Sequence, residues 1–443
     1  MKVVVIGGVA AGMSAASKIK RIDSSTEIVV YEKGSFVSYG ACGLPYYVSG
    51  INEDYTKMIA RTKEEFEKTG MKINLKHEVV KVEPESKQIL VKDLENDRLF
   101  IDSYDKLMIA TGTVPVVPPI KGKDLKGVYV LKTLEDGMIL KKAVEAPEVK
   151  NVVIVGGGYI GIEVAETLLH VGKNVRVVEL APRILQPFDS ELTEMATNIM
   201  METGVKFNLN EKVEELVGTD KVTGVKTDKE SYEADLVILA IGVRPATSFL
   251  KDSGITLAKN GAVVIDREMR TNIADIYSAG DCAEVYNKVK EENSFIPLGT
   301  NANKCGRLAG ENIIGKHNKY VGTIGSSAIK ILDYELGRTG LSESEAKALA
   351  INYKTVFVKA YDHPGYYPDP TPIWIKLIYE ERTNRILGAQ AMGKKGAVLR
   401  VDMFAIAIHN NMTTMDLGMT DLCYAPPFAG VWDAVHIACN AAK

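Results

Sequence analysis

An apolar run that ends in glycine and leads into a helical pattern opens the chain. The apolar residues 2–6 (KVVVI) are followed by Gly7 and Gly8, then by a helix that begins near Gly12, and then by a second apolar run that ends at Glu32. Short apolar runs bounded by turn residues, on either side of a helical pattern, are typical of a strand–helix–strand unit with parallel strands. The N-terminus is therefore predicted to form such a unit.

The same order of patterns returns in the middle of the chain. The apolar run 151–155 (NVVIV) precedes Gly156, Gly158 and Gly161, a helical segment follows, and a further apolar run ends at Glu179. Two strand–helix–strand units in one chain favour an α/β fold with two parallel sheets. The class expected is two Rossmann-like dinucleotide-binding domains.

Three other apolar runs end in a glycine turn, and the pattern then changes. The runs are 104–113, 234–245 and 271–284. From residue 323 onward, alternating segments predict strands with turns between them and one covering helix; these lie in 326–341, 353–361, 372–380, 385–393 and 396–412. The C-terminal part is therefore predicted to be an α+β domain without a glycine-rich cradle.

These patterns divide the 443 residues into three domains, as expected for a chain too long for one core. Residues 1–113 and 246–322 form a discontinuous first nucleotide-binding domain. Residues 114–245 form a second one, and 323–443 form the C-terminal domain.

Composition narrows the class of protein. The chain is 46% hydrophobic and 25% charged, and its formal net charge of −3 favours neither a nucleic acid nor a membrane surface as partner. Five widely spaced cysteines do not form a secreted disulfide framework, and the start of the chain reads as a strand, so a cytoplasmic location is predicted. No cluster of metal-ligating residues is present in the sequence.

The two glycine loops differ in how closely they match a dinucleotide fingerprint. The first has Val9 where the pattern G-x-G-x-x-G needs its central glycine, whereas the second matches throughout. Two cradles predict two different dinucleotides. Glu179 would accept from a ribose 2′-hydroxyl and repel a 2′-phosphate, which favours NADH, but the nearby Arg183 leaves NADPH possible.

One cysteine stands among small residues, in SYGACGLPYY (38–47). Cys42 has no second cysteine nearby and precedes an apparent helix start, where backbone N–H groups favour a thiolate. A redox role therefore requires the partner sulfur to come from a substrate. The other four cysteines, Cys282, Cys305, Cys423 and Cys439, are predicted to be buried and inert.

The order of these motifs resembles a known superfamily. GGVAAG, a single cysteine, ATG, GGGYIG, AIG and AGD resemble the flavin- and NAD(P)H-dependent pyridine nucleotide–disulfide oxidoreductases. Within it, SYGACGLPYYVSG, YYPDPTP and YAPPFAGVWD are similar to the coenzyme A-disulfide reductases and related NADH oxidases. The resemblance implies FAD on the first unit, NADH on the second, a homodimer formed through the C-terminal domain, and a cysteine that alternates between thiolate and a mixed disulfide with CoA.

The resemblance also implies which residues line the cofactor sites. For FAD these are Gly7, Gly8, Ala10, Ala11, Gly12, Glu32, Lys33, Ser38, Ala110, Thr111, Gly112, Gly280, Asp281, Pro297 and Leu298. For NADH they are Gly156, Gly158, Tyr159, Ile160, Gly161, Glu163, Glu179 and Gly242. Tyr159 matches a residue that covers the nicotinamide pocket until NADH displaces it, and Glu163 matches one that borders the nicotinamide.

Substrate and catalytic positions follow from the same resemblance. The CoA phosphates are expected at or next to Ser14, Lys18, Arg21, Ser38 and Arg61. Beside Cys42, the phenols of Tyr367 and Tyr424 match positions that reach the cysteine of the other subunit, and the adjacent Tyr366 is an alternative to Tyr367.

The sequence therefore predicts an enzyme that uses NADH to reduce CoA disulfide through Cys42, with three alternatives. One is an NADH oxidase that reduces oxygen, but Ala10 replaces the histidine that peroxidases and many oxidases of the group have there. Another is a polysulfide or persulfide reductase, some of which carry an added rhodanese domain that this sequence lacks. The third, from another class, is a flavin-bound redox sensor with little turnover.

Overall fold

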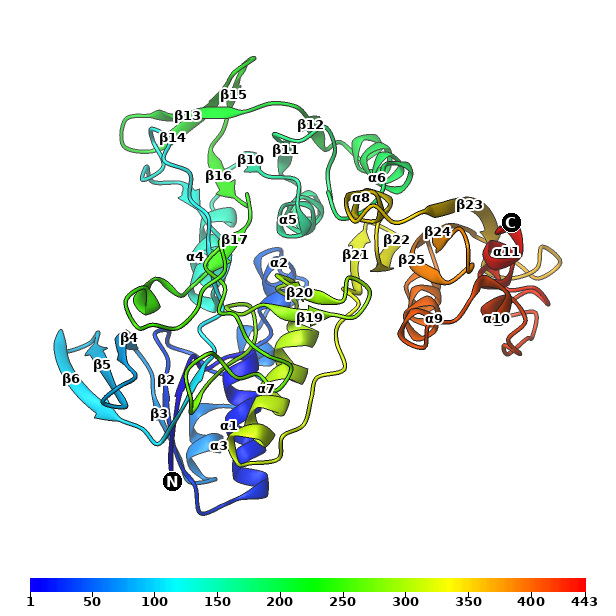
Figure 1. Cartoon of the computed structure of the whole chain (residues 1–443). Helices are drawn as coiled ribbons and strands as arrows, with labels where there is room; N and C mark the ends of the chain where they lie inside the picture. The colour runs from blue at the N-terminus through cyan, green and yellow to red at the C-terminus, as the bar shows by residue number, and fades with distance from the viewer.

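The N-terminal unit builds a parallel sheet in the computed structural model, which describes all residues 1–443 (Figure 1). The order of its strands is β18-β7-β1-β2-β3, and neighbouring strands are parallel. The strands are β1 (Lys2–Ile6), β2 (Glu27–Tyr31), β3 (Met71–Asn74), β7 (Lys106–Ile109) and β18 (Ile276–Ser278). A strand from the later part of the chain, β18, thus completes the sheet that the N-terminus begins.

Two helices pack closely beside this sheet, α1 (Ala10–Ile22) and α7 (Gly299–Ile313) (Figure 1). Glycine permits the contact, because a Cβ atom added to Gly306 would lie 2.4 Å from the carbonyl oxygen of Ala11. A Cβ atom at Gly310 would lie 2.6 Å from the carbonyl oxygen of Ala15. The backbones of the two helices therefore approach closely along this seam.

The middle of the chain forms a second parallel sheet, in the order β12-β11-β10-β16-β9. Its strands are β9 (Val128–Tyr129), β10 (Asn151–Val155), β11 (Asn174–Val178), β12 (Lys206–Asn208) and β16 (Leu236–Leu239). The helices of this part are α4 (Leu134–Val144), α5 (Tyr159–His170) and α6 (Ser190–Glu202). The β10–α5–β11 unit has the strand–helix–strand order that the sequence predicts.

Small antiparallel sheets accompany both parallel sheets. One contains β4 (His77–Glu83), β5 (Gln88–Asp93) and β6 (Arg98–Ser103), and another β13 (Val213–Gly218), β14 (Val222–Thr227) and β15 (Ser231–Glu233). Two further sheets have only two strands each: β8 (Thr113–Pro115) pairs with β17 (Val243–Pro245), and β19 (Val285–Asn287) pairs with β20 (Glu292–Ser294). The β8–β17 pair joins the two connections between the nucleotide-binding units.

The C-terminal part contains one antiparallel sheet, in the order β21-β22-β25-β24-β23. Its strands are β21 (Ser327–Ile331), β22 (Tyr334–Gly340), β23 (Tyr353–Tyr361), β24 (Pro372–Glu380) and β25 (Ile386–Gly393). The helices are α8 (Glu343–Ala348), α9 (Ala397–His409), α10 (Thr414–Gly418) and α11 (Ala434–Ala441). A buried cluster between this sheet and α9 and α11 forms a separate core.

A buried polar network joins the second parallel sheet to the C-terminal part. The Lys376 side chain on β24 is only 3% exposed and contacts carboxylates of Glu191 and Glu343 at 2.7 and 2.6 Å. The Gln390 amide donates to Asp189 at 2.7 Å. A buried ammonium needs such partners, so this network holds the two parts in register.

The predicted fold class is confirmed: two Rossmann-like units are followed by an α+β domain. One boundary differs, because α1 begins at Ala10 and not near Gly12. The remaining short helices are η1 (Ala41–Gly43), α2 (Leu44–Val48), η2 (Tyr55–Met58), α3 (Lys63–Glu67) and η3 (Ser248–Leu250). None of the helices has both the length and the apolar composition required to cross a membrane.

Candidate active site

The first glycine loop follows β1 and has a backbone that only glycine adopts easily. Gly7 has φ +103°, and a Cβ atom there would lie 2.2 Å from the carbonyl oxygen of Ala110. A Cβ atom on Gly12 would lie 1.9 Å from the carbonyl oxygen of Gly7. The loop therefore turns tightly at the carboxyl end of β1 and leaves the start of α1 open to an anionic ligand, in spite of Val9.

The carboxylate of Glu32 lies against this loop. It accepts hydrogen bonds from the backbone N–H groups of Gly8 at 2.6 Å and Gly34 at 2.7 Å. Burial raises the pKa of Glu32, while these two hydrogen bonds favour its charged form. The Thr111 hydroxyl nearby in the ATG turn is buried and has no hydrogen-bond partner, as expected where a polar cofactor supplies one.

Other residues predicted for this cradle lie on the turns beside it. Gly112 and Gly280 have positive φ, and Asp281 forms an ion pair with Lys132 at 3.5 Å. Pro297 and Leu298 lead into α7. The backbone of Lys33 hydrogen-bonds to the Glu32 carboxylate, whereas its side chain is mostly exposed and extends to Glu78, with an Nζ–Oε1 distance of 2.7 Å.

The second glycine loop repeats the geometry of the first. Gly156 has φ +111°, and Cβ atoms on Gly156 and Gly161 would lie 2.4 and 2.0 Å from backbone oxygens. A Cβ atom on Gly158 would meet nothing within 4 Å, so this side of the loop is open. Gly242, with φ +114°, follows the adjacent strand β16. The loop thus provides an open approach to the start of α5.

Glu179 lies at this loop as Glu32 lies at the first. Its carboxylate accepts from the N–H groups of Gly157 at 2.5 Å and Ala181 at 2.7 Å. The guanidinium of Arg183 donates to the carbonyl of Phe188. Arg183 therefore has an internal partner, and Glu179 lies at the second loop as the sequence predicts.

Replacing Glu179 with Gln should increase the use of NADPH, because the carboxylate repels a 2′-phosphate. We expect the NADPH-to-NADH ratio of kcat/KM to rise by roughly tenfold, the change produced by about 1.4 kcal/mol. Steady-state kinetics with both cofactors measures this ratio. The matched control is Glu202→Gln, because Glu202 is an exposed glutamate on α6. An unchanged ratio in Glu179→Gln would show that another residue selects the cofactor.

Cys42 lies in η1, directly before α2, and its side chain is exposed in this chain. Although the residue is exposed as a whole, nearby protein atoms partly desolvate the sulfur and raise the pKa of Cys42; the charges of Glu163 and Asp281 raise this pKa further, whereas Lys132 lowers it. The predicted position at a helix start is correct. Burial and the two carboxylates oppose the preference for thiolate that is expected at a helix start, and α2 has only five residues with which to counter them.

Of two charged residues near Cys42, the sequence analysis identified Glu163 but not Lys132. Glu163, on α5, has a pKa raised to about 7 by burial and by the charge of Glu166. Lys132, between β9 and α4, has no motif in the sequence that points to it, and only the fold brings it to Asp281 and the cysteine. Sequence reasoning missed Lys132 for this reason.

Tyr159 occupies the start of α5 and contacts the C-terminal part. Its hydroxyl lies 2.6 Å from the hydroxyl of Ser327 on β21, and its ring lies 6.0 Å from that of Phe188. Burial raises the pKa of the phenol. The predicted nicotinamide cover therefore lies at the junction of the second sheet with the C-terminal sheet, and Ile160 follows it in α5.

Two tyrosines of the C-terminal part, Tyr366 and Tyr424, form a pair. The sequence had left open whether Tyr366 or Tyr367 faces the site. The Tyr366 hydroxyl lies 2.8 Å from the Tyr424 hydroxyl, and Tyr366 is 73% exposed. Tyr367 instead packs against His363, with ring centroids 5.4 Å apart.

The four other cysteines differ in burial. Cys423, next to Tyr424, is exposed, so the prediction that it is buried is wrong; Cys282, Cys305 and Cys439 are buried.

The residues predicted to hold CoA phosphates are only partly available. Lys18 forms an ion pair with Glu311 at 2.7 Å, and Ser14 donates to Asn303 at 2.8 Å. Arg21 is exposed and donates to a backbone carbonyl of its own helix, and Arg61 stacks on Phe66 at 4.2 Å. Ser38 has φ +51° and its N–H donates to Gly8, which places it at the edge of the first loop.

Fold and site together define a flavoprotein oxidoreductase with two dinucleotide cradles and an exposed cysteine, Cys42, near the first of them. The profile of the pyridine nucleotide-disulphide oxidoreductase family matches residues 1–302, and the dimerisation domain of that family matches 326–435. The chain belongs to this family and is an NAD(P)H-dependent enzyme that uses FAD.

Three proteins illustrate what the chain is similar to. The NAD(P)H sulfur oxidoreductase (CoA-dependent) of Pyrococcus abyssi is 38% identical over 446 residues, covering 100% of this chain and 98% of that protein. Reduced CoADR-RHD of Bacillus anthracis has a TM-score of 0.97 and 34% identity, covering 100% of this chain and 80% of its own. The water-forming NADH oxidase of Lactobacillus brevis bound to NADH has a TM-score of 0.97 and 34% identity, covering 100% of this chain and 98% of that one.

Proposed function

We propose that the protein uses NADH to reduce CoA disulfide to two molecules of CoASH through Cys42. The observation that carries the proposal is the exposed Cys42 thiol, which has no disulfide partner in the chain. A cysteine without a resolving cysteine needs a sulfur from its substrate, and the CoA dependence of the Pyrococcus abyssi relative supports CoA.

The residues of the chain would act on the substrate in two stages. The Cys42 thiolate attacks one sulfur of CoA disulfide, so that the S–S bond breaks, one CoA leaves as thiolate and takes up a proton, and Cys42–S–S–CoA remains. FAD, held by the first glycine loop, would supply the redox chemistry that brings the two electrons of NADH to this mixed disulfide. The S–S bond between Cys42 and CoA then breaks, Cys42 is released as thiolate, and the second CoA thiolate takes up a proton and leaves as CoASH.

A direct assay tests this reaction. Without oxygen, NADH consumption with CoA disulfide should release two thiols for each NADH oxidised. Slow turnover under these conditions, with rapid NADH oxidation in air, would instead support the oxidase named for the Lactobacillus brevis structure. Rapid turnover with polysulfide alone would support the sulfur reductase, and little turnover with any acceptor would support a sensor.

Glu163 is proposed to control the charge on the Cys42 sulfur. Its pKa of about 7 means that the carboxyl is protonated below that pH and charged above it, where it opposes a thiolate. We expect Glu163→Gln to lower the pKa of Cys42, seen as a shift of iodoacetamide alkylation of the FAD-loaded enzyme to lower pH. Glu194→Gln, exposed on α6, is the control; an unshifted profile would contradict this role.

The tyrosine pair is proposed to stabilise the leaving thiolate in the other subunit of a homodimer. The C-terminal domain that carries the pair also exposes several large apolar side chains that a second copy would cover: Leu399, Ile406, Met415, Met419, Phe428, Val431 and Trp432. The match to a dimerisation domain supports that arrangement.

Removing one hydroxyl at a time tests the pair. We expect Tyr424→Phe to lower kcat for CoA disulfide by about 10²-fold, the low end of general acid contributions. Tyr366→Phe should have a similar effect, because this phenol and not that of Tyr367 is hydrogen-bonded to Tyr424. Tyr361→Phe, another exposed tyrosine, is the control; a large loss in Tyr367→Phe alone would restore the assignment made from the resemblance.

A further inference from the structure

A pocket of about 360 Å³ separates the β19–β20 hairpin from the C-terminal domain. Arg267, Tyr286, Lys288 and Glu291 line it from one side, and Arg385 and His409 line it from the other. In Figure 1 the hairpin extends toward α9, at whose end His409 lies. The pocket is thus formed by two parts of the chain and lies outside both glycine cradles.

The cations of this pocket have no carboxylate partner. Neighbouring residues form ion pairs, Arg270 with Glu268 and Lys290 with Glu345, but Arg267, Lys288 and Arg385 form none within 4.0 Å. Arg267 donates to the carbonyl of Tyr320 at 2.8 Å and stacks on the Tyr286 ring at 4.7 Å. Lys288 donates to the carbonyl of His409. Backbone and aromatic contacts therefore position two of the charges without neutralising them.

Arg385 completes the set of cations without a carboxylate partner. Its Nε atom is shielded from solvent and has no hydrogen-bond partner, so a ligand in the pocket would meet the terminal nitrogens of the guanidinium. Arginine presents these nitrogens as paired N–H donors that match phosphate oxygens. The excess of cations around the pocket therefore indicates an anion as the ligand.

The surroundings restrict the kind of anion. Glu291 is the one carboxylate in the lining, so three cations face one opposing charge. A ligand must therefore carry at least two negative charges to be held. The volume lies at the low end of small-molecule sites, which are roughly 300–1,000 Å³, and arginine matches phosphate oxygens through paired N–H groups.

We propose that this pocket binds a compact polyanion of the pyrophosphate type, held between Arg267 and Lys288 on one side and Arg385 on the other. The site goes beyond the chemistry at Cys42 and does not depend on it. Bound there, the anion connects the FAD-binding part to the C-terminal domain.

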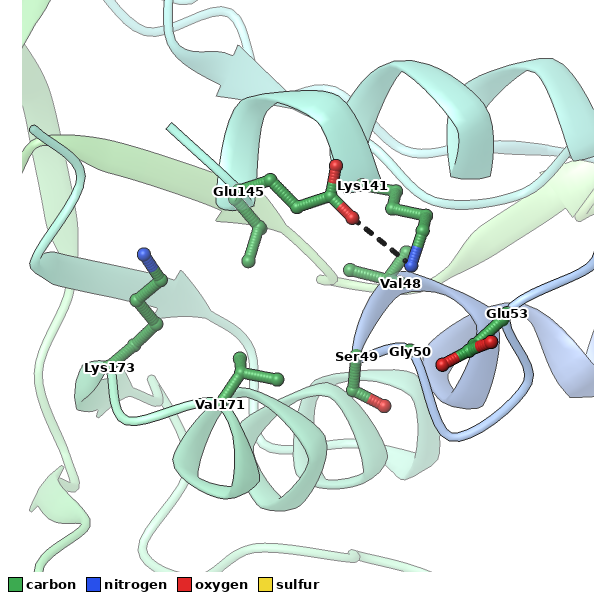
Figure 2. Close-up of a pocket in the computed structure, with 9 residues that line it drawn as sticks. Val48, Ser49, Gly50, Glu53, Lys141, Glu145, Val171 and Lys173 are labelled. Carbon is green, nitrogen blue, oxygen red and sulfur yellow. Dashed lines mark ion pairs between the residues drawn. The ribbon is translucent and has the colours of Figure 1, made fainter. Parts of the chain in front are cut away.

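A larger pocket, about 610 Å³, does not have this character (Figure 2). It lies at the far end of α2 from Cys42, and its lining holds two carboxylates, those of Glu53 and Glu145, for its two lysines. Lys141 pairs with Glu145 at 3.3 Å and donates to the carbonyl of Tyr47, and Lys173 donates to the carbonyl of Val149 at 2.7 Å. The contrast supports the smaller pocket as the anion site.

Calorimetry with inorganic pyrophosphate on the FAD-loaded protein tests the proposal. Excess NAD⁺ and CoA are present, because both glycine loops and the predicted CoA site also favour phosphates. We expect one pyrophosphate per chain with a Kd below about 1 mM. Arg385→Met and Arg267→Met should each raise the Kd by at least about tenfold, as expected for loss of a charge-assisted contact. Lys259→Met, an exposed lysine elsewhere in the FAD-binding part, should leave it unchanged.

A gain of affinity provides a second test that does not depend on the stability of the arginine variants. Glu291→Gln removes the opposing carboxylate and should lower the Kd. Absence of binding in the wild type, or equal binding in wild type, Arg385→Met and Glu291→Gln, would overturn the proposal. Flavin absorbance and NADH reduction of each variant show independently that the protein is folded, whatever its acceptor.

Discussion

Cys42→Ser should abolish the NADH-dependent reduction of CoA disulfide while FAD remains bound. A serine hydroxyl is not ionised near neutral pH and cannot form the mixed disulfide with CoA. We expect kcat to fall by at least about 10³-fold, since loss of an attacking residue costs up to about 10⁶-fold in well-studied enzymes. Thiol release in the absence of oxygen measures the loss.

The matched control is Cys423→Ser, because Cys423 is the other exposed cysteine and lies far from the first glycine loop in sequence. It should retain normal turnover. Undiminished thiol release in Cys42→Ser would remove the proposed nucleophile. Retained NADH oxidation in air, with disulfide reduction lost, would show that oxygen reacts without the thiol.

Substitution of one glycine in each loop should separate the two cofactors. In Gly12→Ala the new Cβ atom would lie 1.9 Å from the Gly7 carbonyl oxygen, so the first loop must open. In Gly161→Ala the Cβ atom would lie 2.0 Å from the Gly156 carbonyl oxygen, and the second loop must open. Overpacking of this kind costs about 1–3 kcal/mol, or roughly 5- to 150-fold in affinity.

The two variants should fail in different ways, and each serves as the control for the other. Gly12→Ala should lose flavin, measured by absorbance after gel filtration. Gly161→Ala should keep flavin but need 5- to 150-fold more NADH to reduce it, on the same estimate. Loss of flavin from Gly161→Ala and not from Gly12→Ala would reverse the assignment of the two cradles.

Much of the fold and part of the site were predictable because their signals are local. Apolar runs that end in glycine specify the strands β1 and β10 and the turns after them, where a Cβ atom would collide with backbone. The acids Glu32 and Glu179 are recognisable because each ends the second strand of its unit. The division at 113, 245 and 322 remains a prediction.

Residues far apart in sequence required the tertiary structure. Lys132 and Glu163 act on Cys42 only because β9, α5 and α2 meet, and neither the sign nor the size of the cysteine pKa shift follows from local sequence. A helix start at Cys42 was predictable, but the opposing carboxylates were not.

The sequence by itself determined the class of protein: two dinucleotide cradles, a cysteine among small residues with no second cysteine nearby, and a C-terminal domain without a cofactor motif. Such features depend on spacing along the chain, and spacing is visible in a sequence. Only the tertiary structure decided that Tyr366 and not Tyr367 is hydrogen-bonded to Tyr424, and that Arg267 and Lys288 share a pocket with Arg385. Side-chain partners across separate elements depend on packing and burial, which adjacent residues do not encode.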